Sequence, residues 1–392
     1  MNKLEELIQD LCPNGVEYVD LEKICQISKG IQFNKKDMHN EGSYPVINGG
    51  INPSGYIEQY NQVENTITIS QGGASAGYVN WIKTKFWAGA HCYVLKPTER
   101  VVNRYLYHFI KSKEYKLQEC QYGAGIPALA KSTVSVLSVP IPPLLVQEEI
   151  VRILDNFTEL TAELTAELTA RKKQYEYYRN TLLIENTKKK ALGNLALSYR
   201  SGGTPLKGNT LFYEGGTIPW LRTQEVVFNE INKTECYITE LAVKETSAKW
   251  IPENCVIVAI SGATAGRCAI NKIPLTTNQH CLAIEINPEL ALYKYVYYCV
   301  CNQYKDLIAK KEGARGDLNS KRILSLEIPI PFPDDKGKSL KEQQRIIDIL
   351  ECFDKLCNDI SEGLPAEIEA RQKQYEYYRD KLLTFKPLEE VK

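Results

Sequence analysis

The sequence contains few of the residues on which most enzymes and metalloproteins depend. Its 392 residues include two methionines and four histidines, at positions 39, 91, 108 and 280. No Gly-x4-Gly-Lys-[Ser/Thr] phosphate loop occurs, and the Gly-x-Ser-x-Gly, His-Glu-x-x-His and Asn/Asp-Pro-Pro-Tyr motifs are also missing. These absences argue against a phosphate-loop nucleotide hydrolase, a serine hydrolase, a zinc protease and an amino-methylase. We predict no catalytic residue and no metal site.

An excess of one charge, a long apolar run and paired cysteines are missing as well. Lys+Arg and Asp+Glu both number 48, which excludes a histone-like polycation but not a local basic face. No apolar stretch approaches the ~18 residues of a membrane span, and the N-terminus is too acidic for a signal peptide. The 12 cysteines contain no Cys-x-x-Cys. This pattern predicts a cytoplasmic protein with reduced thiols.

The chain does contain an internal repeat. Residues 171–179 return at 371–379, and both copies contain Gln-Tyr-Glu-Tyr-Tyr-Arg. Gly-rich segments 73–77 and 262–266 match at an offset of 189, as do His91-Cys92 and His280-Cys281. Two copies of one unit are therefore expected, roughly 1–187 and 188–392, and pseudo-twofold symmetry with them.

Each copy ends in a segment with helical periodicity. Apolar residues recur every three or four positions from 150 to 183, and a matching stripe begins at 346. A long helix is predicted over 147–184, and a break near Gly363-Leu364-Pro365. We favour packing of the two repeat helices against each other, although each stripe alone is also compatible with docking on its own globular part.

A tandem tetrad lies inside the first helical segment. Thr-Ala-Glu-Leu occurs at 161–164 and again at 165–168. Four residues nearly complete one helical turn, so each added unit lengthens the helix with little rotation of its apolar face. The tetrad is interpreted as a length adjuster, and an accident of helix-favouring composition is the alternative.

Short strand-like runs and dense turn signals fill residues 15–140 and 190–331, with helical pieces expected at 103–118 and 291–312. This pattern indicates an α+β domain that is present twice. The repeated His-Cys pairs could supply four zinc ligands. They lie in strand-like stretches, however, so we favour a buried histidine beside a buried thiol.

These features together resemble the specificity subunit of type I restriction–modification enzymes, over essentially the whole chain. The resemblance rests on the twice-occurring Gln-Tyr-Glu-Tyr-Tyr-Arg, on the Pro-Ile-Pro segments at 140–142 and 329–331, on residues 201–205 and on Ile218-Pro219-Trp220. It implies two target-recognition domains, 1–145 and 188–338, a central helix with the tetrads at 146–187, and a C-terminal helix at 339–392. The expected fold is α+β, with the two domains separated by long antiparallel coiled-coil helices.

The resemblance also implies the partners. Each domain would read one half of a bipartite double-stranded DNA target, and the helices would dock two methyltransferase subunits. S-adenosylmethionine, ATP and Mg would belong to partner subunits rather than to this chain, and a restriction/translocase subunit is an optional further partner. No active site and no membrane association are expected on this chain.

Candidate DNA contacts are polar side chains in the Gly-rich parts, because Arg suits guanine, Asn and Gln suit adenine, and Lys suits phosphate. In the first copy they are Gln71, Ser75, Asn80, Trp81, Lys83, Lys85 and Lys131. In the second they are Arg222, Thr223, Gln224, Arg267, Asn271, Asn278, Gln279, Arg315, Asn319, Lys321 and Arg322. The helix or subunit interface is expected at Tyr175, Tyr178, Leu182, Tyr375, Tyr378 and Leu382. No counterpart of Ile218-Pro219-Trp220-Leu221-Arg222 is visible in the first copy.

Two other classes fit the sequence less well. A coiled-coil scaffold without a nucleic-acid role agrees with zero net charge, but it leaves two differing Gly-rich domains unexplained. An enzyme with an unrecognised site is weakened by the missing motifs.

Overall fold

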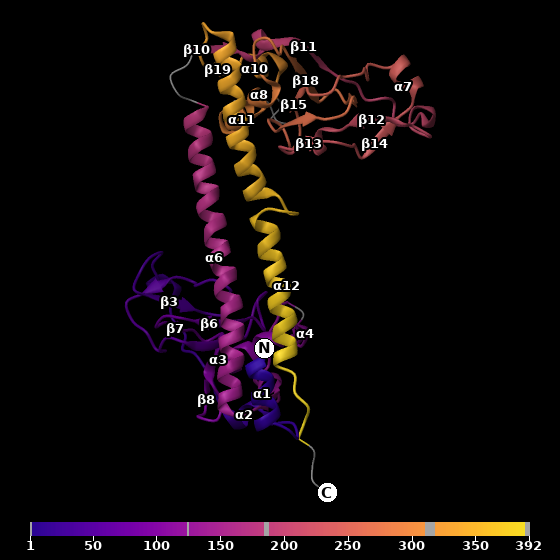
Figure 1. Ribbon diagram of the computed structural model, residues 1–392. Helices are drawn as coiled ribbons and strands as arrows, with labels where there is room; N and C mark the ends of the chain where they lie inside the picture. The colour runs from indigo at the N-terminus through magenta and orange to yellow at the C-terminus, as the bar shows by residue number, and fades with distance from the viewer. Residues whose placement is uncertain (1, 124, 184–187, 310–317, 389–392) are drawn as a thin grey trace. The chain divides into compact units, whose positions relative to one another are not determined.

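The computed structural model describes residues 2–123, 125–183, 188–309 and 318–388. It forms two compact units (Figure 1). Unit 1 comprises Met1–Ala166 and Ala366–Lys392, and unit 2 comprises Glu167–Pro365. The chain therefore passes from one unit to the other twice. Each unit contains residues from more than one of the four segments predicted from the sequence, which are 1–145, 146–187, 188–338 and 339–392.

Unit 1 contains a mixed globular part and two helical segments. Its strands are β1 (Glu17–Asp20), β2 (Cys25–Lys29), β3 (Tyr44–Ile47), β4 (Tyr56–Ile57), β5 (Thr66–Ser70), β6 (Val79–Ile82), β7 (Trp87–Ala88), β8 (Cys92–Pro97) and β9 (Ser138–Ile141). Its helices are α1 (Asn2–Leu11), α2 (Leu21–Ile24), η1 (Lys35–Asp37), α3 (Asn103–Ser112), α4 (Glu114–Glu119), α5 (Lys131–Ser135), the first part of α6 (Leu144–Leu182) and almost all of α12 (Leu364–Leu382).

Unit 2 repeats this plan. Its strands are β10 (Lys188–Ala191), β11 (Ala196–Ser201), β12 (Ile218–Leu221), β13 (Glu230–Ile231), β14 (Cys236–Ile238), β15 (Val256–Ala259), β16 (Cys268–Asn271), β17 (Thr276–Thr277), β18 (Cys281–Ile286) and β19 (Glu327–Ile330). Its helices are the rest of α6, η2 (Leu192–Leu195), η3 (Thr210–Phe212), η4 (Thr223–Glu225), α7 (Glu240–Glu245), α8 (Tyr293–Asn302), α9 (Tyr304–Ala309), α10 (Ser320–Leu324) and α11 (Lys336–Asn358).

The sheets confirm a duplicated α+β fold. The main sheet has the order β2-β8-β5-β6 in unit 1 and β11-β18-β15-β16-β13 in unit 2, so β13 is an addition. A three-stranded sheet, β4-β3-β7 or β14-β12-β17, and a two-stranded sheet, β1-β9 or β10-β19, accompany it. The central strands β5 and β15 are buried along their whole length, as their continuous apolar and threonine runs predict.

A buried glutamine joins each globular part to its repeat helix. Gln147 Oε1 accepts a hydrogen bond from the Val102 N–H, which is 2.8 Å away, and Gln343 Oε1 accepts one from the Leu292 N–H at the same distance. Both glutamines are fully buried. Each satisfies a backbone donor at the start of a helix, α3 or α8, that has no partner within that helix.

The predicted long helix is present as α6, and the predicted break is present between α11 and α12. Gly363 permits that break because a Cβ there would lie 2.6 Å from the carbonyl oxygens of Asp359 and Lys355. The tetrads lie within α6, and the Arg171 guanidinium forms an ion pair with Glu167 at 3.3 Å. The α-helices at 103–112 and 293–302 confirm the expected helical pieces, although residues 310–312 lie outside the described part.

Each unit is completed by a helix of the other repeat, which confirms the inter-repeat pairing. In unit 1 the rings of Phe157 on α6 and Tyr378 on α12 stack with centroids 5.3 Å apart. In unit 2 Phe353 on α11 lies 5.5 Å from Tyr178 and 6.1 Å from Tyr175, both on α6. Phe157 and Phe353 occupy equivalent repeat positions, so the same ring contact is made twice with the partners exchanged.

Candidate nucleic-acid interface

Several turns of unit 1 meet at one end of its sheets. The Gln71 N–H donates to the His91 carbonyl at 2.9 Å, and the Leu129 N–H donates to the Gln71 carbonyl at 2.7 Å. The His91 N–H points to Asn48 Oδ1, 3.3 Å away. The end of β3, the β5–β6 turn, the turn before β8 and the segment before α5 are therefore held together. This clustering places small and polar residues side by side on one surface.

The same turns meet in unit 2. The Ile260 N–H donates to the His280 carbonyl, and the Leu318 N–H donates to the Ile260 carbonyl, both at 2.8 Å. The Ile260–His280 bond repeats the Gln71–His91 bond of unit 1 at an offset of 189. The Thr264 hydroxyl, in the β15–β16 turn, donates to the Thr223 carbonyl at 2.8 Å. Thus the β15–β16 turn is tied to the segment that comes after β12.

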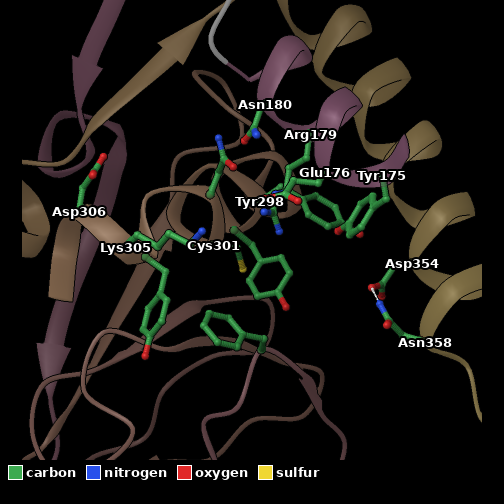
Figure 2. A pocket seen from close by; sticks show the side chains of 14 residues that line it. Tyr175, Glu176, Arg179, Asn180, Tyr298, Cys301, Lys305, Asp306, Asp354 and Asn358 are labelled. Carbon is green, nitrogen blue, oxygen red and sulfur yellow. Dashed lines mark hydrogen bonds between the residues drawn. The ribbon is translucent and has the colours of Figure 1, made fainter. Parts of the chain in front are cut away.

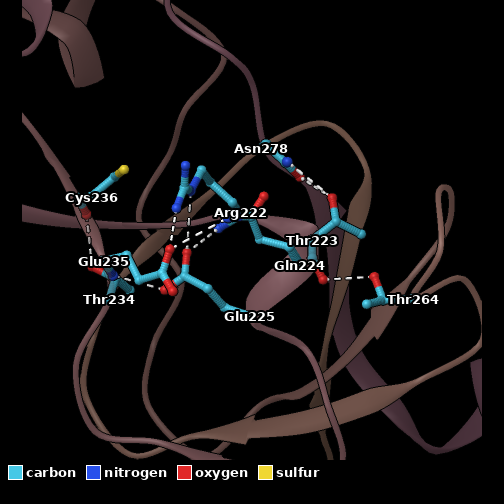
Figure 3. A network of polar contacts seen from close by, with 9 residues as sticks. All are labelled: Arg222, Thr223, Gln224, Glu225, Thr234, Glu235, Cys236, Thr264 and Asn278. Carbon is cyan, nitrogen blue, oxygen red and sulfur yellow. Dashed lines mark hydrogen bonds and ion pairs between the residues drawn. The ribbon is translucent and has the colours of Figure 1, made fainter. Parts of the chain in front are cut away.

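A polar network occupies this end of unit 2 (Figure 3). The Arg222 guanidinium forms an ion pair with Glu235, and its Nε lies 3.6 Å from Glu225 Oε1. Asn278 Nδ2 donates to the Thr223 hydroxyl at 3.0 Å. Two carboxylates thus flank one guanidinium, so Arg222 is oriented and its charge is compensated. That environment disfavours a phosphate, because the carboxylates would repel it.

Most of the predicted DNA-contact residues lie on or next to these turns. In unit 1 these are Gln71, Ser75 and Lys131. In unit 2 these are Arg222, Thr223, Gln224, Arg267, Asn278, Gln279 and Asn319. Asn319 also has a local role, since its Oδ1 caps α10 by accepting the Arg322 N–H at 2.8 Å. Of the others, Lys131, Gln224 and Gln279 are exposed, and the remaining six are half-buried.

Several predicted residues lie elsewhere. Asn80 and Trp81 are on β6, where Trp81 lies beneath the Arg104 guanidinium with 4.8 Å between charge and ring. Lys85 lies 4.7 Å from the Tyr60 ring, and Lys83 is exposed just beyond β6. These four residues lie away from the turn cluster, on or just beyond the edge strand β6, and the two lysines suit a phosphate contact.

The remaining candidates of unit 2 also lie away from the turn cluster or outside the described residues. Asn271 is fully buried, and its Nδ2 donates to the carbonyls of Pro252 and Ile273 at 2.7 and 2.9 Å. We therefore withdraw it as a DNA contact. Lys321 is exposed on α10, Arg322 lines a separate cavity of about 620 Å³, and Arg315 lies outside the described residues.

The expectation of buried histidines beside buried thiols is wrong for the histidines. His91 and His280 are exposed, because both lie in turns that precede the strands rather than within them. The thiols are buried, and burial raises the pKa of Cys92 and of Cys281 to about 12. Zinc binds the thiolate, which such burial disfavours. Among the described residues, no group of three or more metal-ligating side chains occurs.

Sequence reasoning missed four polar residues at these turns, namely Asn48, His91, Thr264 and His280. The two histidines recur at the same offset of 189, which could have indicated their role in the turns. They were instead assigned to strand interiors, so they were not considered as site residues. Asn48 was missed because the sequence showed no counterpart of residues 218–222 in the first copy. That expectation is wrong. Strand β3 is that counterpart, and Asn48 takes the position of Arg222.

The predicted interface residues lie along the helix pairs. Tyr375 is buried, Tyr175, Leu182, Tyr378 and Leu382 are half-buried, and Tyr178 is 37% exposed. By contrast, Tyr177 and the equivalent Tyr377 are 65% and 63% exposed. In unit 2 a cavity of about 670 Å³ opens beside α6, and Figure 2 shows that tyrosine rings and charged groups line it.

The comparisons with known proteins agree with this duplicated architecture. The family model of the type I restriction modification DNA specificity domain matches residues 13–171 and 184–370. The chain belongs to this specificity family. The Escherichia coli specificity subunit of type I restriction enzyme EcoR124I/EcoR124II is 34% identical over 417 residues, covering 100% of this chain and 99% of that protein. A putative Haemophilus influenzae type I restriction enzyme specificity subunit is 32% identical over 408 residues, covering 97% and 98%.

Solved structures of specificity subunits share the fold. The S subunit from M. genitalium matches with a TM-score of 0.63 and 19% identity, covering 94% of this chain and 96% of that one. The HsdS subunit from Thermoanaerobacter tengcongensis matches with a TM-score of 0.50 and 14% identity, covering 95% and 97%. The chain is therefore a DNA specificity subunit of a type I restriction–modification system, and its part is recognition rather than catalysis. Within the described residues, no helix is long and apolar enough to cross a membrane.

Proposed function

We propose that each unit of this specificity subunit reads one half of a bipartite double-stranded DNA target. The observation that carries the proposal is the repetition of one turn cluster with different side chains. Gln71, Ser75 and Asn48 in unit 1 take the places that Ile260, Thr264 and Arg222 hold in unit 2. A shared backbone frame with exchanged polar groups is suited to two different half-sites.

Phosphate contacts would surround these reading residues. Lys83 and Lys131 are exposed in unit 1, and Lys321 is exposed in unit 2. Lysine at such positions neutralises phosphates without regard to sequence, so it contributes affinity and salt dependence but no base preference. We therefore expect substitution of these lysines to weaken binding to all duplexes alike.

The proposal assigns docking of two methyltransferase subunits to the helix pairs. Tyr177 and Tyr377 support it, because two large, exposed rings at equivalent repeat positions form two similar anchor points. The methyltransferases would use S-adenosylmethionine to methylate adenines. ATP and Mg would be used by a restriction/translocase subunit, where the system includes one.

Exchange of one domain tests the proposal. Residues 15–140 are replaced by the corresponding residues of another specificity subunit, and the methylated sites are mapped by methylome sequencing of cells that carry the subunit with its methyltransferase. One half-site should change completely, and the other half-site should keep its bases. A simultaneous change in both halves would contradict independent reading by the two units.

A further inference from the structure

The strands β3 and β12 hold the same place in their sheets. Each is the middle strand of a three-stranded sheet. Ile47 pairs in parallel with Ala88, and Leu221 pairs in parallel with Thr277. Each strand also pairs antiparallel with a strand that comes later in the chain, β4 or β14. The residues directly after β3 and β12, Asn48 and Arg222, are therefore structural equivalents.

The neighbouring turn is also equivalent in the two units. The Gly89 N–H donates to the Ile47 carbonyl at 2.8 Å, and the Asn278 N–H donates to the Leu221 carbonyl at 3.0 Å. Gly89 in unit 1 therefore corresponds to Asn278 in unit 2. Each turn directly follows the short strand that pairs with β3 or β12, so it lies beside Asn48 or Arg222.

A side-chain amide closes this turn in both units, but it comes from different positions. In unit 1 the His91 N–H donates to Asn48 Oδ1, across the sheet. In unit 2 the His280 N–H donates to Asn278 Oδ1 at 3.1 Å, within the turn itself. Because Asn278 performs this task in unit 2, position 222 is released from it and carries an arginine instead.

The amide of Asn48 and an asparagine at position 89 cannot both occupy this space within unit 1. A Cβ atom at Gly89 would lie 2.3 Å from Asn48 Oδ1, closer than any real contact. An asparagine in the turn thus forces the Asn48 amide out of the rotamer that accepts the His91 N–H. The residue at the strand end and the residue in the turn are therefore coupled.

We propose that Asn48 and Arg222 are equivalent base-reading residues, and that each forms an exchangeable specificity pair with its turn residue, Gly89 or Asn278. This inference rests on the proposed function. Asn48 Nδ2 makes no hydrogen bond to any residue that the structure describes, so both its hydrogens remain for a base acceptor. Arg222 keeps Nη1 for a base edge while Glu235 and Glu225 fix its plane, and guanine O6 and N7 match such donors.

Substitution of Asn48 by aspartate tests the reading role. Asn48→Asp keeps the oxygen that accepts the His91 N–H and replaces the donor with an acceptor. Preference at one base pair of one half-site should move from an acceptor to a donor such as cytosine N4. The change should amount to about five- to 150-fold in discrimination, the range that one good base contact supplies. Binding selection from randomised duplexes, with the purified subunit–methyltransferase complex, measures it.

Asn52→Asp is the matched control for charge. Asn52 is exposed in the loop between β3 and β4, so this variant adds the same charge without altering the pair. It should weaken binding to all sequences and leave base preferences unchanged. An identical change of preference in both variants would overturn the proposal.

Exchange of the whole pair tests the coupling. Gly89→Asn alone should impair binding by unit 1, because of the contact with Asn48. Asn48→Arg with Gly89→Asn should restore binding, with guanine preferred at the same base pair. If Asn48→Asp and the double variant both keep the original preference while methylation continues, the inference is wrong and the proposed function stands. If the unmodified complex shows no sequence preference, the proposed function itself fails.

Discussion

Gln147 and Gln343 make the same hydrogen bond in the two halves of the chain, each from its repeat helix to the first turn of a helix in its own globular part. Gln147 also donates to the Pro142 carbonyl at 2.8 Å, and Gln343 donates to the Ser339 hydroxyl at 3.2 Å. The bonds to Val102 and Leu292 connect each repeat helix to its own globular part.

Replacement of either glutamine by leucine should destabilise one unit only. The change leaves a partly buried backbone N–H without this partner, which costs about 1 kcal/mol and at most about 3 kcal/mol. Hydrogen exchange should accelerate around Val102 in Gln147→Leu and around Leu292 in Gln343→Leu. Gln344→Leu, at an exposed neighbouring position, is the control and should change neither region. Acceleration in both units from one variant would show that the two contacts are not separate.

The stability of unit 1 should fall in mild acid. His108 is fully buried, with Nε2 2.8 Å from Asp155 Oδ1 and Nδ1 3.1 Å from the Tyr375 hydroxyl. Burial, aided by the charge of Arg104, lowers the pKa of His108 although Asp155 opposes this shift. The unfolded chain therefore takes up a proton near pH ~6.5 that the folded unit resists. Stability is complete above that pH and declines as the pH falls below it.

A tyrosine at position 108 checks this pH dependence. The equivalent residue of unit 2 is Tyr298, which does not titrate in this range. The free energy of unfolding, measured by denaturant titration in neutral and in mildly acidic buffer, should differ less in His108→Tyr than in the unmodified protein. Phe109→Tyr, one position along the helix, serves as the control for an added hydroxyl. An unchanged difference between the two buffers would remove His108 as the cause.

The two kinds of tyrosine on the helices should behave differently. Aspartate at Tyr175 and Tyr178 would place charges against Phe353 and should cost about 3–5 kcal/mol, which is the size of a lost buried aromatic. Aspartate at the exposed Tyr177 and Tyr377 should leave the thermal unfolding temperature unchanged and weaken methyltransferase association. Size-exclusion chromatography of the complex and a thermal melt distinguish these outcomes. Normal association of the Tyr177 and Tyr377 variant would contradict the assigned docking surface.

One additional tetrad after Leu168 should lengthen the unread spacer of the target. Four residues add about 6 Å to α6 and rotate the rest of the helix by about 40°. One base pair adds about 3.4 Å and rotates the duplex by about 34–36°. We expect one additional base pair of spacer, with both half-sites unchanged, in methylome mapping. Insertion of two residues is the control, because a rotation of about 200° should abolish assembly. An unchanged spacer would show that α6 does not set the distance.

The repeat, the long helix and its break were predictable, because they depend on local periodicity and on near-identical segments such as 171–179 and 371–379. The sequence left two possible packing partners for each helix, because a stripe of apolar residues does not indicate which surface covers it. The contact between Phe157 and Tyr378 identifies the partner. The equivalence of β3 and β12 was concealed, because short strands carry little pattern and only the prolines at 45 and 219 are shared. Pairing register, rather than sequence, reveals it.

The candidate site was also predictable only in part. Gln71 and Asn278, which the structure places in turns, were predicted from the hydrogen-bonding chemistry of their side chains. Asn271 was wrongly placed in the site, because a strand of mixed composition does not indicate which side chains face inward. Asn48 needed the three-dimensional alignment of two strands whose end residues, 48 and 222, are 174 positions apart.

The exchange of helices makes each half of the chain complementary to a copy of itself. Residues 1–187 hold Phe157, which contacts a tyrosine at the Tyr378 position, and Tyr178, which contacts a phenylalanine at the Phe353 position. Because these are repeat equivalents, a second copy of the same half offers both surfaces. A half-length product of this gene should therefore pair with itself rather than remain single, and such a homodimer would present two identical readers to a palindromic target.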